Sequence, residues 1–341
     1  MTSVTVVGGG IFGLSCAWEM VRRGARVRLI EARRIGAGSS GGHVGALAPH
    51  APENWNPKKA FQLDSLLLAP AFWVGVEAAS GLPSGYARTG RLQPVADAAA
   101  AERLRDRIAA AAERWPADCA MGLTDAPAGD LVPESPSGFW LFDGLTARLS
   151  PRAAGAALAA AIRNHGGDIV EGQDPGSLAG AVLWATGTPG LEDLSRDLGR
   201  PVGKGVKGQS ALLRYAAPDA PQVFADGLHV VPHADGTVAV GSTSQNDYAD
   251  LNVDDRIDAL IAKARGICPQ LRDAPVIDRW AGARPRARTR APILGPWPGR
   301  PGHYVANGGF KIGFGMAPKI AQVVADLILN GHDTIPDGFR L

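Results

Sequence analysis

The sequence predicts an α/β fold in which two domains share the chain and exchange it more than once. The 341-residue chain opens with a strand–loop–helix–strand pattern, and a second strand–loop–helix pattern closes it. Between these ends, residues 206–244 change to the two-residue alternation that is typical of β-strands. A chain that returns at its end to the kind of unit with which it began indicates interleaved domains, because two domains joined by a linker would not repeat that unit.

The composition is that of an ordinary globular protein and argues against several functional classes. Hydrophobic residues make up 45% of the chain, charged residues make up 20%, and the formal net charge is +2. This balance argues against a nucleic-acid partner, and the spacing of Cys16, Cys119 and Cys268 is not that of metal ligands. No apolar run approaches the length of a membrane span, and the N-terminus lacks a signal-peptide pattern. We therefore expect a cytoplasmic protein with no metal site and no integral membrane segment.

The first structural unit is a strand, a helix and a second strand. Residues 4–7 form a short apolar strand, and residues 14–21 carry apolar side chains at helical spacing up to Gly24. Residues 27–30 form the second strand, which ends in Glu31. The unit is a complete βαβ motif, so the first domain is expected to contain a parallel sheet.

The loop of this unit has the glycine pattern of a dinucleotide site. Gly8, Gly10 and Gly13 follow the first strand and open the helix, in the spacing G-x-G-x-x-G. Such glycines let a pyrophosphate approach the backbone at a helix N-terminus, and a carboxylate at the position of Glu31 binds ribose hydroxyls. An acidic residue there disfavours the 2′-phosphate of NADP. NAD and FAD both remain open at this point.

The next segment favours FAD. Residues 36–50 ("GAGSSGGHVGALAPH") are too rich in glycine for regular structure. An NAD domain usually continues here with another short βα unit, whereas a long Gly/Ser loop over an extended cofactor is more typical of FAD enzymes. Further elements are expected as helices at 60–80 (kinked at Pro70), 98–114, 151–165 and 320–328, strands at 181–187 and 206–244, and a hairpin turn at Asp235-Gly236.

In these and other segments, the chain resembles the D-amino acid oxidase superfamily, and within it most closely the glycine oxidases. The resemblance spans nearly the whole chain in the order of the family. The matching segments are "VVGGGIFGLSCAWEMVRRGARVRLIE", "GAGSSGGHVGALAP", "VKGQ", "VVPHADGTVAVGSTS", "WAGARP", "APILGPWP" and "YVANGGFKIGFGMAP".

The resemblance implies an FAD-binding Rossmann-type domain interleaved with an α+β substrate domain, which is built on a large, mainly antiparallel sheet. The FAD-binding domain is expected to comprise residues 1–45, 60–80, 145–200 and 296–341. The substrate domain is expected to comprise residues 46–59, 81–144 and 201–295.

The resemblance also implies which residues bind FAD. The second glycine-rich loop, residues 309–313, is expected beside the end of the flavin ring where negative charge develops, since backbone donors at a helix N-terminus stabilise such charge. His43 aligns one position away from a histidine that carries covalent flavin in some amine dehydrogenases. The expected cofactor-binding residues are Gly8, Gly10, Ile11, Phe12, Gly13, Glu31, Ala32, Arg33, Ser39, Ser40, His43, Val44, Gly45, Ala46, Gly187, Gly309, Phe310, Lys311, Ile312 and Gly313.

Four residues are expected in the catalytic site. Arg284 matches the family arginine that binds the substrate carboxylate, where a planar guanidinium makes two parallel charge-assisted hydrogen bonds. His229 stands where glycine oxidases have a substrate-contacting tyrosine, Ser244 replaces a methionine of their pocket, and Lys311 stands where the family usually has arginine. These three departures predict a pocket that differs from that of the glycine oxidases.

The implied activity is oxidation of the C–N bond of a small amino acid or N-substituted amino acid, by hydride transfer from the α-carbon to flavin N5. Oxygen or a quinone is the implied electron acceptor, and a homo-oligomer remains open. One alternative is a flavin-binding subunit of an amine dehydrogenase complex. A second is an RNA-base-modifying relative, which would need an attached methyltransferase or a broad basic surface, and the sequence shows neither.

Overall fold

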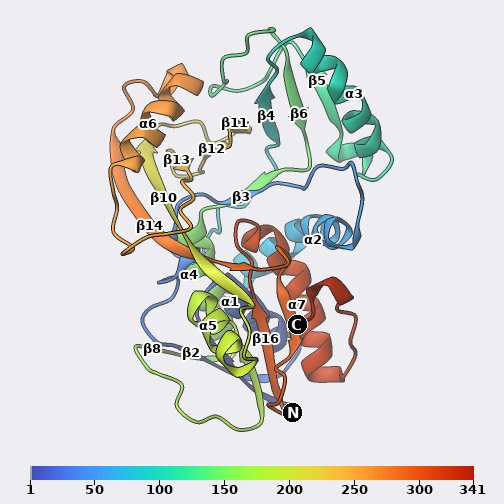
Figure 1. The fold of residues 1–341 in the computed structure, drawn as a ribbon, viewed down its shortest axis with the longest axis vertical. Helices are drawn as coiled ribbons and strands as arrows, with labels where there is room; N and C mark the ends of the chain where they lie inside the picture. The colour runs from blue at the N-terminus through green and yellow to red at the C-terminus, as the bar shows by residue number, and fades with distance from the viewer. Residues whose placement is uncertain (1) are drawn as a thin grey trace.

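The computed structural model describes residues 2–341 as an elongated molecule with two large β-sheets, one in each half (Figure 1). Both chain termini lie in the half that contains the smaller sheet. This arrangement confirms the predicted mixed α/β fold with a large, mainly antiparallel sheet.

The smaller sheet has six strands, with β1 near its centre. All neighbouring strands run parallel except the pair at the edge, β15 and β16, which is antiparallel. The strand order is β15 (Ile293–Pro296), β16 (His303–Asn307), β9 (Ala181–Trp184), β1 (Ser3–Val7), β2 (Arg26–Glu31) and β8 (Asp168–Glu171).

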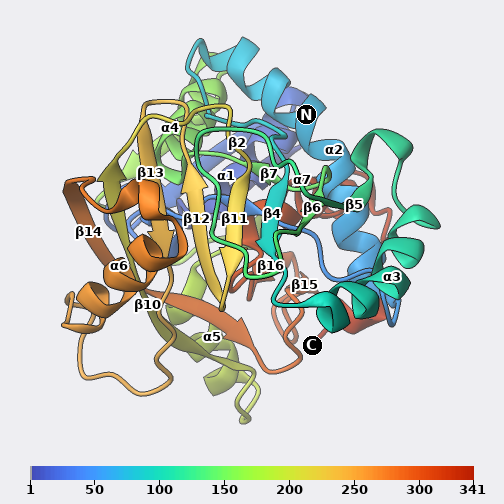
Figure 2. The same ribbon diagram turned by 90° about the horizontal axis from the view of Figure 1, so that it is seen from above.

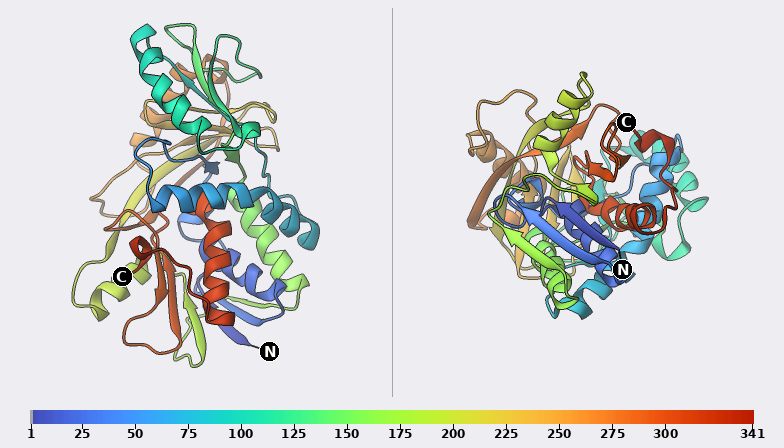
Figure 3. Two further views of the ribbon diagram at one scale, coloured as in Figure 1. Left: turned by 90° about the vertical axis from the view of Figure 1, so that its right-hand side faces the viewer. Right: turned by 90° about the horizontal axis from the view of Figure 1, so that it is seen from below.

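Three helices pack together beside this sheet, and a fourth lies across them. Helix α1 (Ile11–Arg22) contacts α4 (Pro151–Asn164) and α7 (Gly313–Asn330), and α2 (Pro57–Ser80) contacts both α4 and α7 (Figure 3). Together they bury the largest apolar core of the protein. Helix α5 (Gly187–Asp197) contacts β16 and also two strands of the larger sheet.

The larger sheet has eight strands and is antiparallel except for one pair, β11 with β4. Helix α6 (Arg256–Ile267) covers its outer face and closes a second apolar core (Figure 2). The strand order is β14 (Val276–Ala287), β10 (Gly203–Arg214), β13 (Thr237–Gly241), β12 (Leu228–Pro232), β11 (Gln222–Ala225), β4 (Arg91–Pro94), β6 (Trp140–Asp143) and β5 (Met121–Thr124).

A small third sheet and one peripheral helix complete the fold. Strand β3 (Ala46–Leu47) pairs with β7 (Ala147–Arg148) between the two halves, and α3 (Ala98–Ala112) packs on β5. Short 3-10 turns lie at 39–41, 117–119, 269–271 and 337–339.

Residues 60–80 are predicted as a helix kinked at Pro70, and the observed helix α2 also has the length and composition of a membrane span. An 18-residue window within it has a mean hydropathy of 1.2, and only 28% of that window is buried. This finding differs from the expectation that no apolar run approaches the length of a membrane span. The buried residues of α2, among them Phe61, Leu66 and Trp73, pack into the core with α7 and α4, so this side of the helix is part of the folded protein.

The two large sheets suggest where the domains divide. We propose the division given above with one adjustment, at residues 293–296. Strand β15 pairs only with β16 in the six-stranded sheet, so we place these residues with the cofactor-binding part of the chain.

Candidate functional site

The first glycine loop is folded so tightly that side chains would not fit at two of its positions. A Cβ atom on Gly13 would overlap the carbonyl oxygen of Gly8, and one on Gly8, whose φ is +111°, would overlap the carbonyl oxygen of Ala185. The helix that follows has Gly10 as its N-cap and no side-chain cap of its own. Backbone N–H groups at the start of α1 therefore face the loop, as an anion-binding helix terminus requires.

The carboxylate of Glu31 lies beside this loop. It accepts hydrogen bonds from the backbone N–H of Gly9 (2.7 Å) and of Arg33 (2.9 Å), and the hydroxyl of Ser40 accepts one from the N–H of Ile11 (3.0 Å). A glycine loop without room for side chains, a helix N-terminus whose N-cap is glycine and an adjacent carboxylate fit the phosphates and ribose of an adenine dinucleotide.

The second glycine loop lies directly against the first. A Cβ atom on Gly309 would lie 2.7 Å from Cζ of Phe12, and one on Gly313 would lie 3.4 Å from Cγ2 of Ile11. The N–H of Phe310 donates to the carbonyl oxygen of Pro285 in β14 (3.0 Å), so this loop also touches the eight-stranded sheet. The two glycine loops thus form one continuous surface at the junction of the two halves.

The Gly/Ser loop crosses from the first half to the larger sheet, where His43 is anchored. Nδ1 of His43 lies 3.1 Å from the hydroxyl of Ser210, and Nε2 lies 3.1 Å from the carboxylate of Asp278, which also binds Arg152 at 2.7 Å. Burial lowers the pKa of His43, although the hydrogen bond to Asp278 opposes that change. Both ring nitrogens are therefore engaged by the protein in this structure.

The other predicted cofactor residues lie at several places around the glycine loops. Val44 packs against the position of Gly241, and a Cβ atom on Gly45 would overlap the carbonyl oxygen of Leu149. Ala46 begins β3, and Ala32 and Arg33 are exposed beside Glu31. Gly187 begins α5, and its carbonyl oxygen accepts a hydrogen bond from Asn307 (2.8 Å).

One face of the eight-stranded sheet carries the predicted substrate residues. Arg284 in β14 lies opposite Val206 in β10. Ser210, four residues further along β10, points to the same face as Val206. Across the next two strands, Ser210 lies opposite Gly241 in β13, and Gly241 lies opposite His229 in β12. Because residues directly opposite one another point to the same face, Arg284 and His229 share the face to which His43 is anchored.

Arg284 is a buried cation without a counter-charge. Its side chain forms no ion pair with any residue of the described chain, and the residue is 8% exposed. Nη2 donates to the carbonyl oxygen of Thr243 (3.1 Å), whereas Nη1 is buried and has no hydrogen-bond partner in residues 2–341. Burial lowers the pKa of Arg284 to about 10. A buried donor in this state favours binding of an external anion.

The charge of Lys311 acts on two of the other predicted catalytic residues. Burial lowers the pKa of His229 to about 3, and the positive charges of Arg91 and Lys311 contribute to that change. Lys311 is exposed to solvent at part of its side chain, yet partial burial lowers its pKa, with a further contribution from the charge of Arg284. The imidazole of His229 is therefore neutral at neutral pH.

Ser244 lines an open hollow of about 440 Å³ together with Thr243, Gln245, Asn246, Asp247 and Arg256. None of the other three predicted catalytic residues, Arg284, His229 and Lys311, lines this hollow. Within residues 2–341 no group of three or more histidine, cysteine or acidic side chains could hold a metal ion.

Two polar residues beside His229 were not predicted from the sequence, Arg91 and Gln222. Arg91 forms a buried ion pair with Asp143 (2.8 Å), and its register partner Gln222 lies 3.4 Å from Nδ1 of His229. Arg91 and Gln222 lie in short strands that carry no motif. The hairpin of β11 and β12 brings Gln222 beside His229, whereas Arg91 is brought there by the pairing of β4 with β11, for which the sequence carries no local pattern.

Comparisons with known proteins agree with this arrangement. A family model described as FAD dependent oxidoreductase (DAO) matches residues 3–327. The glycine oxidase of Pseudomonas putida is 28% identical over 360 residues, which cover 98% of this chain and 96% of that protein. The glycine oxidase of Geobacillus kaustophilus is 26% identical over 370 residues, which cover 95% of this chain and 92% of that protein.

Solved structures share the fold. The crystal structure of the Geobacillus kaustophilus glycine oxidase matches with a TM-score of 0.84 at 22% identity, over 100% of this chain and 99% of that one. The structure of an iminodiacetate oxidase from Chelativorans sp. BNC1 matches with a TM-score of 0.83 at 20% identity, over 99% and 98% of the two chains. Since the family model covers nearly the whole chain and the glycine loops fit its cofactor, the chain belongs to the DAO family of FAD-dependent oxidoreductases.

Proposed function

We propose that the protein oxidises the C–N bond of a small amino acid or N-substituted amino acid. The observation that carries this proposal is the buried guanidinium of Arg284, which has an unpartnered Nη1 and no acidic partner. A substrate carboxylate supplies the missing charge and accepts two hydrogen bonds in a fixed plane. The glycine oxidases among the relatives support an amino acid as the substrate.

We propose that FAD is held by the two glycine loops, Glu31 and the Gly/Ser loop. Residues 8–13 would bind its pyrophosphate, and Glu31 would bind its ribose. Residues 39–46 and 309–313 would lie beside its flavin ring at the junction of the two halves. When bound, FAD supplies the chemistry of a two-electron acceptor, which takes a hydride from carbon. The chain's own residues bind and orient the substrate against it.

The charges of the site suggest how the substrate amine is prepared. A protonated amine cannot release a hydride from its α-carbon, so the neutral amine is the reactive form. The cation of Lys311 disfavours a second positive charge nearby and thereby lowers the pKa of a bound amine. His229, with a pKa of about 3, does not hold a proton at neutral pH and acts as a neutral hydrogen-bonding group instead of a general base.

Anaerobic reduction of the bound flavin tests this proposal. Glycine, sarcosine, D-alanine and other N-methyl or D-amino acids are added without oxygen while the flavin absorbance is followed, and air is then admitted. We expect at least one of them to bleach the flavin. Rapid recovery in air identifies oxygen as the acceptor, and recovery only with a quinone identifies a dehydrogenase. A stable yellow protein that no amine bleaches would contradict the proposal and favour a non-catalytic flavin-binding subunit.

A further inference from the structure

The segment after β13 is attached to the middle of β10 by a short ladder. The N–H of Lys207 donates to the carbonyl oxygen of Gln245 (3.0 Å), the N–H of Gln245 donates back (2.9 Å), and the N–H of Thr243 donates to the carbonyl oxygen of Gln209 (3.2 Å). This register places Ser244 opposite Gly208, on the same sheet face as Arg284. Lys207 and Gln209 point to the opposite face.

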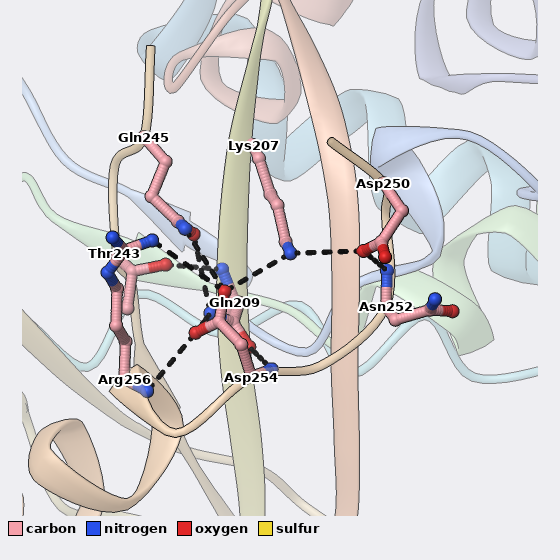
Figure 4. A network of polar contacts seen from close by, with 8 residues as sticks. All are labelled: Lys207, Gln209, Thr243, Gln245, Asp250, Asn252, Asp254 and Arg256. Atoms are coloured by element: carbon pink, nitrogen blue, oxygen red, sulfur yellow. Dashed lines mark hydrogen bonds and ion pairs between the residues drawn. The ribbon is translucent and has the colours of Figure 1, made fainter. Parts of the chain in front are cut away.

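On that opposite face, four side chains form a network that we call the latch: Lys207, Gln209, Gln245 and Asp254 (Figure 4). Nε2 of Gln209 donates to Asp254 (2.6 Å), and the N–H of Asp254 donates back to Oε1 of Gln209 (2.9 Å). The same carboxylate accepts from Nε2 of Gln245 (3.1 Å) and pairs with Nζ of Lys207 (3.2 Å). Lys207 is 3% exposed and Gln209 is fully buried.

We infer that the latch positions Arg284 for substrate binding. The carbonyl oxygen of Thr243 accepts a hydrogen bond from the Arg284 guanidinium (3.1 Å). The latch fixes the segment that carries this carbonyl, because the side chain of Gln245 is held by Asp254 (3.1 Å) and Gln209 (3.3 Å). The four latch residues act from behind the sheet, so they are positioning residues. This inference rests on the proposed function, because it takes the substrate carboxylate to bind Arg284.

The composition of the latch supports a positioning role over a purely stabilising one. A buried lysine needs compensation for its lost hydration, and a well-packed apolar pair at such a site is often as stable. Residues 243–245 form only a few backbone hydrogen bonds with β10, so the latch side chains add to the contacts that hold this segment in place. Bidentate binding of a carboxylate needs the guanidinium in one plane, and a fixed Thr243 carbonyl provides this orientation.

Asp254→Asn and Lys207→Met test the inference. Asp255→Asn is the matched control, because Asp255 is the next residue and its side chain forms no hydrogen bond or ion pair within residues 2–341. Sodium acetate is titrated into each flavin-loaded protein, and its binding is followed by the flavin absorption spectrum. We expect the Kd for acetate to rise about tenfold in both test variants, the fold-change of a typical coupling between neighbouring residues, and to stay unchanged in the control.

The thermal melting temperature and the FAD content of each variant are measured alongside. A lower melting temperature in both test variants with an unchanged Kd for acetate would show that the latch only stabilises the fold, and would overturn the inference. Acetate binding needs no turnover, so this result leaves the proposed oxidation untouched. A parent protein that does not bind acetate at all would instead overturn the carboxylate site, and with it both the proposed function and the role of the latch.

Discussion

The guanidinium of Arg284 occupies the space where a side chain on Gly208 would lie. A Cβ atom on Gly208 would overlap Nη2 and Cζ of Arg284, and Gly208 stands opposite Gly282 in the neighbouring strand. Glycine at this position lets the arginine lean along the sheet surface toward Thr243. The sequence "VKGQ" therefore contributes to both faces of β10. Lys207 and Gln209 point to the face of the latch, and Gly208 leaves space for Arg284 on the opposite face.

Gly208→Ala should displace Arg284 and weaken substrate binding. The new methyl group and the guanidinium cannot share the space, so we expect the half-saturating amino acid concentration for flavin reduction to rise at least about tenfold, with FAD still bound. Gly266→Ala in α6 is the control, since a Cβ atom there meets nothing within 4 Å. Equal half-saturation in the two variants would show that Arg284 can move without consequence.

Arg284→Ala should leave FAD bound and abolish reduction by amines that carry a carboxylate. Loss of the charge-assisted pair leaves the substrate carboxylate unpaired in a buried site, at a cost of roughly 3–5 kcal/mol. Stopped-flow absorbance of the flavin under anaerobic conditions measures this loss. Reduction at the parent rate with unchanged apparent affinity would assign Arg284 a structural role.

Gly13→Ala should prevent FAD binding, since the new Cβ atom would overlap the carbonyl oxygen of Gly8 inside the first loop. We expect the purified variant to be colourless, whereas denatured parent protein releases FAD and not FMN. Mass spectrometry of the released cofactor checks both statements. Gly75→Ala on α2, where a Cβ atom meets nothing within 4 Å, should keep its FAD. FMN in the parent would contradict the assignment of Glu31 to the ribose.

Stability should fall as the pH is lowered from about 6.5 toward 3. Burial lowers the pKa of His229 to about 3 and that of His233 to about 4, from an ordinary 6.5, so the unfolded state binds more protons in this window. Each histidine contributes stability that is present above pH 6.5 and lost as the pH falls, with a slope of up to about 1.4 kcal/mol per pH unit. We expect the free energy of unfolding, measured with urea at each pH, to fall less steeply between pH 4 and 6 in His229→Gln than in the parent.

The matching control for this titration is His332→Gln, because His332 is exposed near the C-terminus. Its unfolding curve should follow that of the parent at every pH. If the free energy of unfolding changed with pH equally in the parent and in His229→Gln, His229 would not be a buried neutral group.

Lys311→Met should lower the midpoint potential of the bound flavin and slow its reduction. Lys311 follows Phe310 in the second glycine loop, and a cation there favours added negative charge on a nearby group. For a two-electron couple, a loss of about 1.4 kcal/mol corresponds to a drop of about 30 mV. Lys311→Arg keeps the charge and should restore most of the rate. A redox titration that gives the parent potential for Lys311→Met would show that the charge of Lys311 does not act on the flavin.

Much of the fold could be predicted because its signals are local. The first βαβ unit, the helix that begins at Ala98 and the hairpin turn at Asp235-Gly236 all follow from short patterns of apolar residues, caps and turn residues. The structure agrees with these predictions to within a few residues. The boundaries between the two domains follow from strand pairing between distant segments, for which the sequence carries no local signal.

In the site, too, only residues that lie in a local sequence pattern could be predicted. Arg284 and the glycine loops carry motifs, so they were predicted, although their assigned roles stay predictions. The ion pair of Arg91 with Asp143 carries no motif, because it depends on the register of strands far apart in the chain. Lys207 and Gln209 of the latch lie in the matching segment "VKGQ", but their partner Asp254, in the segment before α6, lies in no motif. A buried polar side chain in a strand is hidden in the sequence, because its hydrogen-bond partners are contributed by other elements.

The most direct test of the central claim compares D-alanine with D-alaninamide in anaerobic flavin reduction by the parent protein. The two amines differ only in the carboxylate, which Arg284 is proposed to bind. If D-alanine itself is not accepted, the best amino acid of the panel and its amide are used. We predict half-saturation by the amino acid at a concentration at least about a hundredfold lower than by the amide, the ratio for a loss of about 3 kcal/mol. Equal half-saturation by both compounds would contradict the claim that this site recognises an amino acid by its carboxylate.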